Sequence, residues 1–504
     1  MTLERNQYCC MLDYLVILSK RAAARAAKDL GAPIRAARSL ASGRVTRERR
    51  ASKYSTRLPS RNLVSTFTGF ALTPSRRIYV LGGTLFVALA MCSRGRPGEP
   101  SFIIPLAGAG VAYLLAIREF FSTPIFPRRV IVVGLTLAAV WQLLFLLKPP
   151  GSDDDIHRYV WDGRVQRLGY NPYIAVPSDP ALGWLHTPET RTLNHPDLPS
   201  PYPPGAELFF RMVTAIHEST FALKVVFVIC DWLALLLLFN ILRISKLGEH
   251  WVLAYAWHPL LATEVAGSGH IDIVGALLLL VSAAALVRRR RPLAAVAFAL
   301  AIAIKLLPIV LLPLYWKRIR IRDGALSALV FGLLCAPFLR QGRMPIGSLG
   351  TYMQYFRFND PVFAVLERVA APGFVGALAA LLGVLTAIWL RCKVPQRFTE
   401  SAFAWPMTVS LLCAPVVYPW YLLWTLPFLC PNAPDPGASG TPMRSASRLP
   451  IMIWTVSIIP TYYVWHLRTL GRPWLVPGWI LLLEYGSVAV AAAILMLPQL
   501  RRAR

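Results

Sequence analysis

The segment from Phe221 to Leu242 reads FALKVVFVICDWLALLLLFNIL, and it decides the fold class of this chain. A helix needs about 20 predominantly apolar residues to cross the hydrocarbon core of a bilayer. Only Lys224 and Asp231 are charged in this segment, so it is long and apolar enough to span a membrane.

The composition extends the same conclusion to most of the 504 residues. Charged residues make up 15% and apolar residues 56%, and the mean hydropathy is +0.50. A soluble globular protein carries about 25% charged residues, and a disordered chain is poorer in apolar residues. The composition therefore excludes both classes for the bulk of the chain.

Apolar runs recur along the chain after about residue 77. Some are shorter than a full span, and they predict an all-α polytopic membrane protein with about 12–14 transmembrane or re-entrant helices. The runs are 78–92, 102–117, 130–147, 221–242, 251–266, 271–287, 292–315, 325–339, 374–390, 402–416, 418–430, 451–465 and 479–498.

Residues 1–77 differ from this membrane domain, which we place at 78–504. The arm holds 16 Lys and Arg against 4 acids, and its one apolar patch is too short to span. The favoured interpretation is a disordered cytoplasmic tail, and the alternative is a basic segment on an anionic membrane surface. No aromatic interleaving or fold motif indicates nucleic-acid binding.

Basic flanking residues orient the spans, since Lys and Arg gather in cytoplasmic loops. With the arm inside, Arg128, Arg129 and the run Arg288–Arg291 are inside, and the long loop 149–220 is outside. The segment 292–315 has basic flanks at both ends, and Lys305 and Pro308 interrupt its middle. We therefore expect it to enter the membrane and return as a hairpin.

The outer loop 149–220 concentrates acid on a strongly basic chain, with nine acids against five bases. Ser152 and Asp155 fit a capping box for a short helix from Asp153 to about Leu168, which Gly169 would end. On this helix Asp155, Arg158 and Asp162 share one face. Helix capping and an ordinary Arg158–Asp162 pair are the alternatives to a functional role.

A helix cap does not need three consecutive carboxylates such as Asp153, Asp154 and Asp155. Because like charges repel, their clustering indicates a role beyond capping. A carboxylate at the membrane surface can act as a general base toward a substrate hydroxyl. A second carboxylate can orient the first or hold a divalent cation such as Mg²⁺ or Mn²⁺ through its oxygens. Whether a metal is required stays open.

The stretch DDIHRYVWDGRVQRLGYNPY at 154–173 resembles the first-loop signature of bacterial membrane glycosyltransferases of the C-type superfamily. The most similar are polyprenyl-phosphate-mannose-dependent mannosyltransferases. Tyr202-Pro203-Pro204, Gly269-His270-Ile271-Asp272 and Pro419-Trp420-Tyr421 also resemble theirs, and the resemblance covers about 149–430. His157 stands where an aromatic residue is expected.

The resemblance implies a many-helix fold in the bacterial inner (plasma) membrane, with an extracytoplasmic active site. It implies a polyprenyl-phosphate sugar donor, a lipid or glycan acceptor, and inversion at the anomeric carbon. By position in the motif, Asp154 takes the role of base and Asp155 comes second.

Further polar residues inside or beside spans are candidates for substrate binding. Glu264, His270 and Asp272 lie where two spans meet; His270 could donate to a phosphate or sugar oxygen, and Asp272 could fix its tautomer. A plain helix junction is the alternative. The candidates for the phosphate are Lys305, Arg158 and Arg357. The substrate-binding set is completed by Asp162, Tyr202, Trp420 and Tyr421.

The favoured function is therefore an inverting membrane hexosyltransferase, most simply a mannosyltransferase. The competing class is a lipid-linked sugar flippase or a proton-coupled transporter, in which buried charges and broken helices also occur. A transporter predicts repeated halves, which the sequence does not display, and it does not need an acidic loop on one side.

Overall fold

The computed structural model describes residues 72–151, 154–341, 344–393, 400–430 and 448–503. Over these residues the regular elements are helices, and the only bridge of β type is an isolated parallel one between Phe358 and Val416. The predicted all-α polytopic class is confirmed. The chain divides into the units 1–70 and 71–504; most of the predicted arm lies outside the described residues, and the first helix begins at Pro74.

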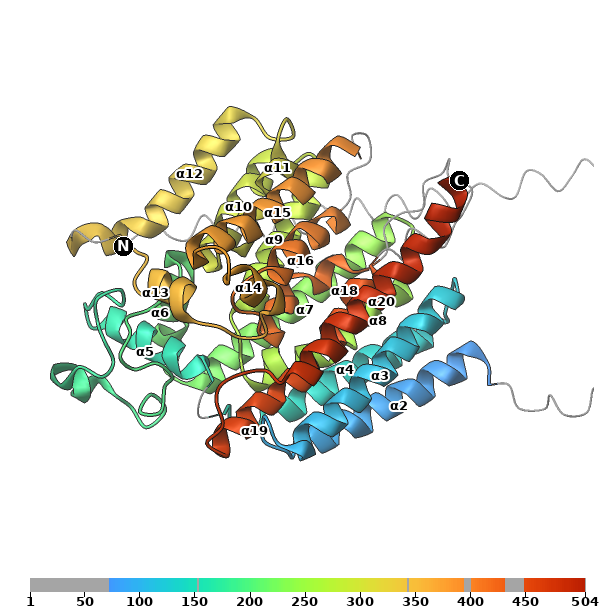
Figure 1. Ribbon diagram of the computed structural model, residues 1–504, viewed down its shortest axis with the longest axis horizontal. Helices are drawn as coiled ribbons and strands as arrows, with labels where there is room; N and C mark the ends of the chain where they lie inside the picture. Colours follow the sequence, from blue (N-terminus) through green and yellow to red (C-terminus); the bar gives the residue numbers. More distant parts are fainter. Residues whose placement is uncertain (1–71, 152–153, 342–343, 394–399, 431–447, 504) are drawn as a thin grey trace, which may run out of the picture. The chain divides into compact units, whose positions relative to one another are not determined.

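Within the described residues, seven helices are long and apolar enough to cross a bilayer, or eight if a bent pair counts as one span. Figure 1 shows α2, α3 and α4 running side by side. The seven are α2 (Pro74–Cys92), α3 (Pro100–Ser122), α4 (Arg128–Leu146), α7 (Thr220–Ile244), α12 (Ile321–Cys335, continued to Leu339), α15 (Pro372–Lys393) and α20 (Gly478–Ala503).

The other apolar runs form short or broken helices, which is why the full-length spans among the described residues are fewer than the runs. Prolines and glycines interrupt these runs. The pieces are η2 (Glu249–Trp251), α8 (Val252–Ala256), η3 (Leu261–Gly267), α9 (Asp272–Val287), α16 (Ala404–Leu412), η7 (Pro419–Trp424), η8 (Leu426–Phe428), α18 (Leu449–Ser457), η9 (Ile459–Tyr462) and α19 (Tyr463–Thr469). η6 (Glu400–Phe403) precedes α16.

A sharp break lies between η3, a π-helix, and α9, whose axes differ by 113°. Gly269 sits in the corner with φ +76°, a left-handed conformation that glycine adopts without strain. A Cβ there would lie 2.4 Å from Cδ1 of Ile156. The corner therefore depends on glycine both for its conformation and for the close approach of the outer loop.

The segment 292–315 turns back on itself, as the charge pattern predicted. α10 (Arg291–Ile304) ends at Lys305, which is extended, and η4 (Leu307–Leu311) and α11 (Leu312–Tyr315) follow. Oγ of Ser282 lies 2.6 Å from both the carbonyl of Ala294 and the hydroxyl of Tyr315. The two ends of the segment are thus at the same depth, and Lys305 is at its apex.

The loop between α4 and α7 folds around α5 (Ile156–Arg167), η1 (Pro180–Leu185) and α6 (Pro204–Ile216). Helix α5 begins slightly later than predicted and ends as predicted: Gly169 has φ +88°, and the N–H of Tyr170 bonds the carbonyl of Val165 at 2.9 Å. Ser152 and Asp153 lie outside the described residues, so the predicted capping box is not described.

A second loop after α12 packs on the first. It holds η5 (Ala336–Gln341), α13 (Leu349–Tyr355) and α14 (Pro361–Leu366). Oγ of Ser348 donates to the carbonyl of Pro199 at 2.7 Å, and Nδ2 of Asn171 donates to the carbonyl of Phe338 at 3.1 Å. The two loops therefore form one layer at the same end of the helices.

The hairpin makes a topological prediction. In a cysteine-free background, Arg290→Cys and Arg320→Cys should react with a membrane-impermeant maleimide from the same side of the membrane. Tyr170→Cys, in the first loop, should react only from the other side. Labelling in right-side-out and inverted vesicles measures this, and reaction of Arg290→Cys and Arg320→Cys from opposite sides would contradict the hairpin.

Candidate active site

Two carboxylates precede α5 at the membrane surface. Oδ2 of Asp154 accepts a hydrogen bond of 2.6 Å from the backbone N–H of Gly151. Asp155 is the N-cap residue, but its side chain makes no capping hydrogen bond. Its Oδ1 accepts from Nδ2 of Asn194 at 2.7 Å, and its Oδ2 lies 3.9 Å from Nδ1 of His270. Capping therefore does not explain why Asp155 is an acid.

The environment of Asp154 disfavours its charge. Burial raises the pKa of its carboxyl to about 7, with Glu264 and Asp155 acting in the same direction. His270 and the N–H of Gly151 lower this pKa, but by less than burial raises it. A carboxyl group with a pKa near neutrality exchanges protons readily at physiological pH, which is the property a general base requires.

His270 lies in the corner between η3 and α9, enclosed on three sides. Its Nε2 forms an ion pair of 3.2 Å with Oε2 of Glu264, whose Oε1 accepts from the hydroxyl of Tyr462. The ring of Trp420 stacks on the imidazole at 4.0 Å between centroids, with the planes 8° apart. Glu264 thus lies where it can orient the imidazole, a role that the sequence had offered to Asp272.

Asp272 instead anchors the apex of the hairpin. Its Oδ1 accepts from Nζ of Lys305 at 2.7 Å and from Nε1 of Trp424 at 2.7 Å. The ammonium of Lys305 also lies 3.6 Å from the centroid of the Tyr421 ring. A cation at membrane depth needs such partners. Lys305 is therefore held in an ion pair with Asp272, while its side chain stays partly exposed.

Arg158 and Asp162 form the ordinary i,i+4 pair that was the alternative to substrate binding. Nε of Arg158 donates to Oδ1 of Asp162 at 2.9 Å, and its Nη1 donates to the carbonyl of Leu198 at 2.9 Å. Asp162 is fully buried, with an exposed fraction of 0%. Its carboxylate is engaged within the loop, so the structure shows a structural role for Asp162, and the substrate contact stays a prediction.

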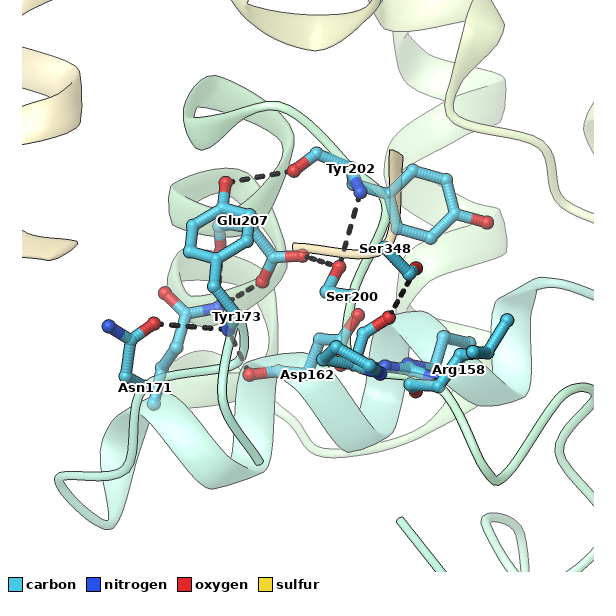
Figure 2. A network of polar contacts seen from close by, with 11 residues as sticks. Arg158, Asp162, Asn171, Tyr173, Ser200, Tyr202, Glu207 and Ser348 are labelled. Carbon is cyan, nitrogen blue, oxygen red and sulfur yellow. Dashed lines mark hydrogen bonds and ion pairs between the residues drawn. The ribbon is translucent and has the colours of Figure 1, made fainter. Parts of the chain in front are cut away.

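The same network includes Glu207, as Figure 2 shows. Nε2 of Gln166 donates to Oε2 of Glu207 at 2.7 Å, and the hydroxyl of Ser200 bonds Oε1. Burial raises the pKa of both carboxyls, Asp162 and Glu207. Arg158 is the cation of this network, and it neutralises one of the two carboxylates. The hydrogen bonds of Asp162 and Glu207 hold α5, α6 and the segment around Ser200 together.

Arg357 and Tyr202 are the remaining predicted residues, and they differ in how close they lie to Asp154 and Asp155. Arg357 pairs with Oε2 of Glu367 at 3.0 Å and covers the Phe363 ring. Tyr202 packs edge-on against Tyr159 at 5.1 Å, and its pKa is raised by burial and by the charge of Asp155. Arg357 is thus engaged locally, whereas Tyr202 borders Asp155.

The structure therefore gathers most, but not all, of the predicted site residues at one end of the helices. They form two groups, which meet where the rings of Trp420 and Tyr421 lie 6.1 Å apart. One group is Asp154, Asp155, Glu264, His270 and Trp420, and the other is Asp272, Lys305 and Tyr421. Two further members, Tyr462 and Trp424, were not predicted, and they carry no signal of their own in the sequence. Lys224 was not predicted either, although a charge inside a span is such a signal.

Lys224 joins this set through backbone contacts. Its Nζ donates to the carbonyl of Phe145 at 3.0 Å and to that of Lys148, so it satisfies the carbonyl end of α4. Its Cγ lies 3.1 Å from the position a Cβ of Gly269 would take. Lys224 thereby packs α4 and α7 against the His270 corner.

A metal site is not evident in the described part of the chain. No group of three or more His, Cys, Asp or Glu residues there could hold an ion. The divalent cation considered from the sequence stays a prediction, and no step proposed below depends on it.

The Lys305–Asp272 pair makes a prediction about stability. Asp272→Asn should lower the free energy of unfolding by about 1–3 kcal/mol, because an ammonium at membrane depth loses its counter-charge. Lys305→Met combined with Asp272→Asn should recover part of this loss. Thermal unfolding in detergent measures both, and a double variant no more stable than Asp272→Asn alone would contradict the pairing.

Comparison with known proteins points to one family. Residues 76–318 match the family model of the alpha-(1->6)-mannopyranosyltransferase N-terminal domain. The chain is similar to alpha-(1->6)-mannopyranosyltransferase A of Mycobacterium tuberculosis, with 23% identity over 343 residues. The match covers 58% of this chain and 64% of that relative, which is just under two thirds of its length. No solved structure matches.

The matched range ends shortly after the Lys305 hairpin and contains the carboxylates, the His270 corner and Lys305. The resemblance predicted from the sequence is thereby confirmed: residues 76–318 are similar to the N-terminal domain of alpha-(1->6)-mannopyranosyltransferases.

Proposed function

We propose that this protein is a membrane mannosyltransferase that moves mannose from a polyprenyl-phosphate donor to a hydroxyl group of a lipid or glycan acceptor. The supporting observation is the cluster at the loop end of the helices. There the first loop meets the η3–α9 corner, so that Asp154 feels the charges of His270, Glu264 and Asp155, and the hairpin apex places Lys305 on Asp272, two residues after His270. The match to mannosyltransferases supplies the reaction class.

The active site faces the extracytoplasmic side in this proposal. The basic flanks Arg128–Arg129, Arg243 and Arg288–Arg291 lie at the helix ends away from the acidic loop. Lys and Arg gather in cytoplasmic loops, which supports a bacterial inner membrane with the acidic loop outside. A lipid-linked donor suits that side, because a polyprenyl phosphate delivers its sugar at the membrane surface.

The transfer is a single displacement. The oxygen of the acceptor hydroxyl attacks the anomeric carbon, and the carboxylate of Asp154 takes the hydroxyl proton. The bond from the anomeric carbon to the phosphate oxygen breaks, and the polyprenyl phosphate leaves with the bonding electrons. Attack opposite the leaving group inverts the anomeric centre. The pKa of about 7 places Asp154 where a base is effective at neutral pH.

Lys305 is the cation that we assign to the departing phosphate. Asp272 holds its ammonium on one side, but the side chain keeps an exposed fraction of 25%. A fixed cation stabilises charge that develops on a leaving group, because the cation does not need to reorganise during the reaction. Asp155, held by Asn194, is the second carboxylate beside the base.

A flippase or proton-coupled transporter is the alternative function. The buried charges and broken helices in the sequence were the reason to consider this function. In the structure these charges pair with one another within the cluster. The transferase match favours the enzyme, so the following experiments address transfer.

Asp154→Asn tests the base. With purified protein, labelled polyprenyl-phosphate mannose and a crude lipid acceptor, this variant should transfer at least about 100-fold more slowly, since general-base catalysis contributes roughly 10²–10⁴-fold. Asp197→Asn, an exposed acid of the same loop, is the matched control and should transfer normally. An active Asp154→Asn variant would remove the proposed base.

The pH dependence provides a second test. Because Asp154 must be ionised to accept a proton, kcat/KM should fall as the pH drops below about 7. A carboxyl with an ordinary pKa would place this fall near pH 4. A rate that is flat between pH 5 and pH 8 would exclude Asp154 as the titrating base.

A further inference from the structure

The gap between Asp155 and His270 is the feature that the proposed function leaves unused. Oδ2 of Asp155 and Nδ1 of His270 face each other at 3.9 Å, which is too far for a hydrogen bond. The imidazole is buried, with an exposed fraction of 2%, and its Nδ1 has no hydrogen-bond partner. A buried polar atom without a partner is costly, so its position calls for an explanation.

The other atoms of both side chains are already engaged. Asn194 holds Oδ1 of Asp155, and Glu264 pairs with Nε2 of His270. The Trp420 ring covers one face of the imidazole. These contacts keep both side chains from turning toward each other. Oδ2 of Asp155 and Nδ1 of His270 are therefore placed to bind a third group between them.

The charges around the gap indicate the chemistry of the group that would bind there. Glu264 and Asp155 flank the imidazole, and carboxylates favour its protonated form, in which Nδ1 carries a hydrogen. The gap thus has a cationic N–H donor on one side and a carboxylate acceptor on the other. A hydroxyl oxygen can accept from Nδ1–H and donate its own proton to Oδ2 at about 2.8 Å from each. A phosphate oxygen would instead meet the carboxylate of Asp155.

We propose that Asp155 and His270 bind a non-reacting sugar hydroxyl between them and so hold the sugar beside Asp154. This inference rests on the proposed function and deepens it. The hydroxyl is not the attacking one, because accepting a hydrogen bond from a cation would weaken it as a nucleophile. Trp420 is stacked between the imidazole of His270 and the ring of Tyr418, and it fixes the plane of the imidazole at this position.

The neighbouring residues act as positioning residues for this subsite. Tyr462 donates to Glu264, and Glu264 aims the imidazole. Gly269 has no Cβ, and this allows Ile156, next to Asp155, to approach the His270 corner. The subsite is therefore assembled by η9, η3 and α5 together.

The test measures binding, so that it does not depend on transfer. Titration calorimetry gives Kd for octyl α-D-mannopyranoside and its monodeoxy analogues in one arm, and for polyprenyl-phosphate mannose and its monodeoxymannose analogues in the other. In the wild type, loss of one hydroxyl in one arm should weaken binding about 10- to 100-fold, as expected for hydrogen bonds to charged groups. The arm that responds identifies whether the acceptor or the donor supplies the hydroxyl.

The variants Asp155→Asn and His270→Gln should bind the parent sugar more weakly and lose the penalty for that one deoxy analogue. His258→Gln is the matched control, since His258 is a buried histidine bonded to Thr455 outside the cluster. Tyr462→Phe should reduce the penalty for that deoxy analogue without abolishing binding of the parent sugar. This variant replaces His270→Gln in the test if His270→Gln does not fold.

The same deoxy penalties in the wild type and in both variants would overturn the subsite, because the gap would then hold only water. Absence of a penalty for every analogue in the wild type would overturn it as well. Failure of the proposed function appears differently, as a wild-type protein that binds these sugars without transferring mannose.

Discussion

The cost of placing charge at membrane depth is the constraint on which this structure depends. Lys305 and Asp272 stand at the apices of two folded-back segments, and each would be unstable there without the other. Their ion pair, shared with Trp424, ties the hairpin to the η3–α9 corner. The helices break where these residues must meet, and the irregular backbone at that depth is covered by protein.

The cluster around this pair follows from the same requirement. Glu264 and His270 are both buried and neutralise each other, and Tyr462 satisfies one further oxygen of Glu264. The first loop adds Asp154 and Asp155 from outside the spans, and Gly269 lets that loop come close. The resulting site combines a carboxyl group of raised pKa with a fixed cation, which is the combination that a displacement at an anomeric carbon needs.

The layer of loops over the cluster has its own polar core. Arg158, Asp162 and Glu207 join α5 to α6, and Ser348 attaches the second loop to the first. A buried network of this kind is destabilising if it loses one partner, so it fixes one arrangement of the loops. Asp162 is therefore important to the fold of the loops.

The sequence by itself determined the membrane class, the acidic loop, the helix that ends at Gly169 and the hairpin centred on Lys305. These follow from local signals: apolar run length, basic flanks and cap residues. Only the tertiary structure decided which charges pair. His270 meets Glu264 rather than Asp272, and Arg158 points into the loop core, because partners at membrane depth are chosen by the packing of segments far apart in the chain. Spacing along one sequence does not encode that packing.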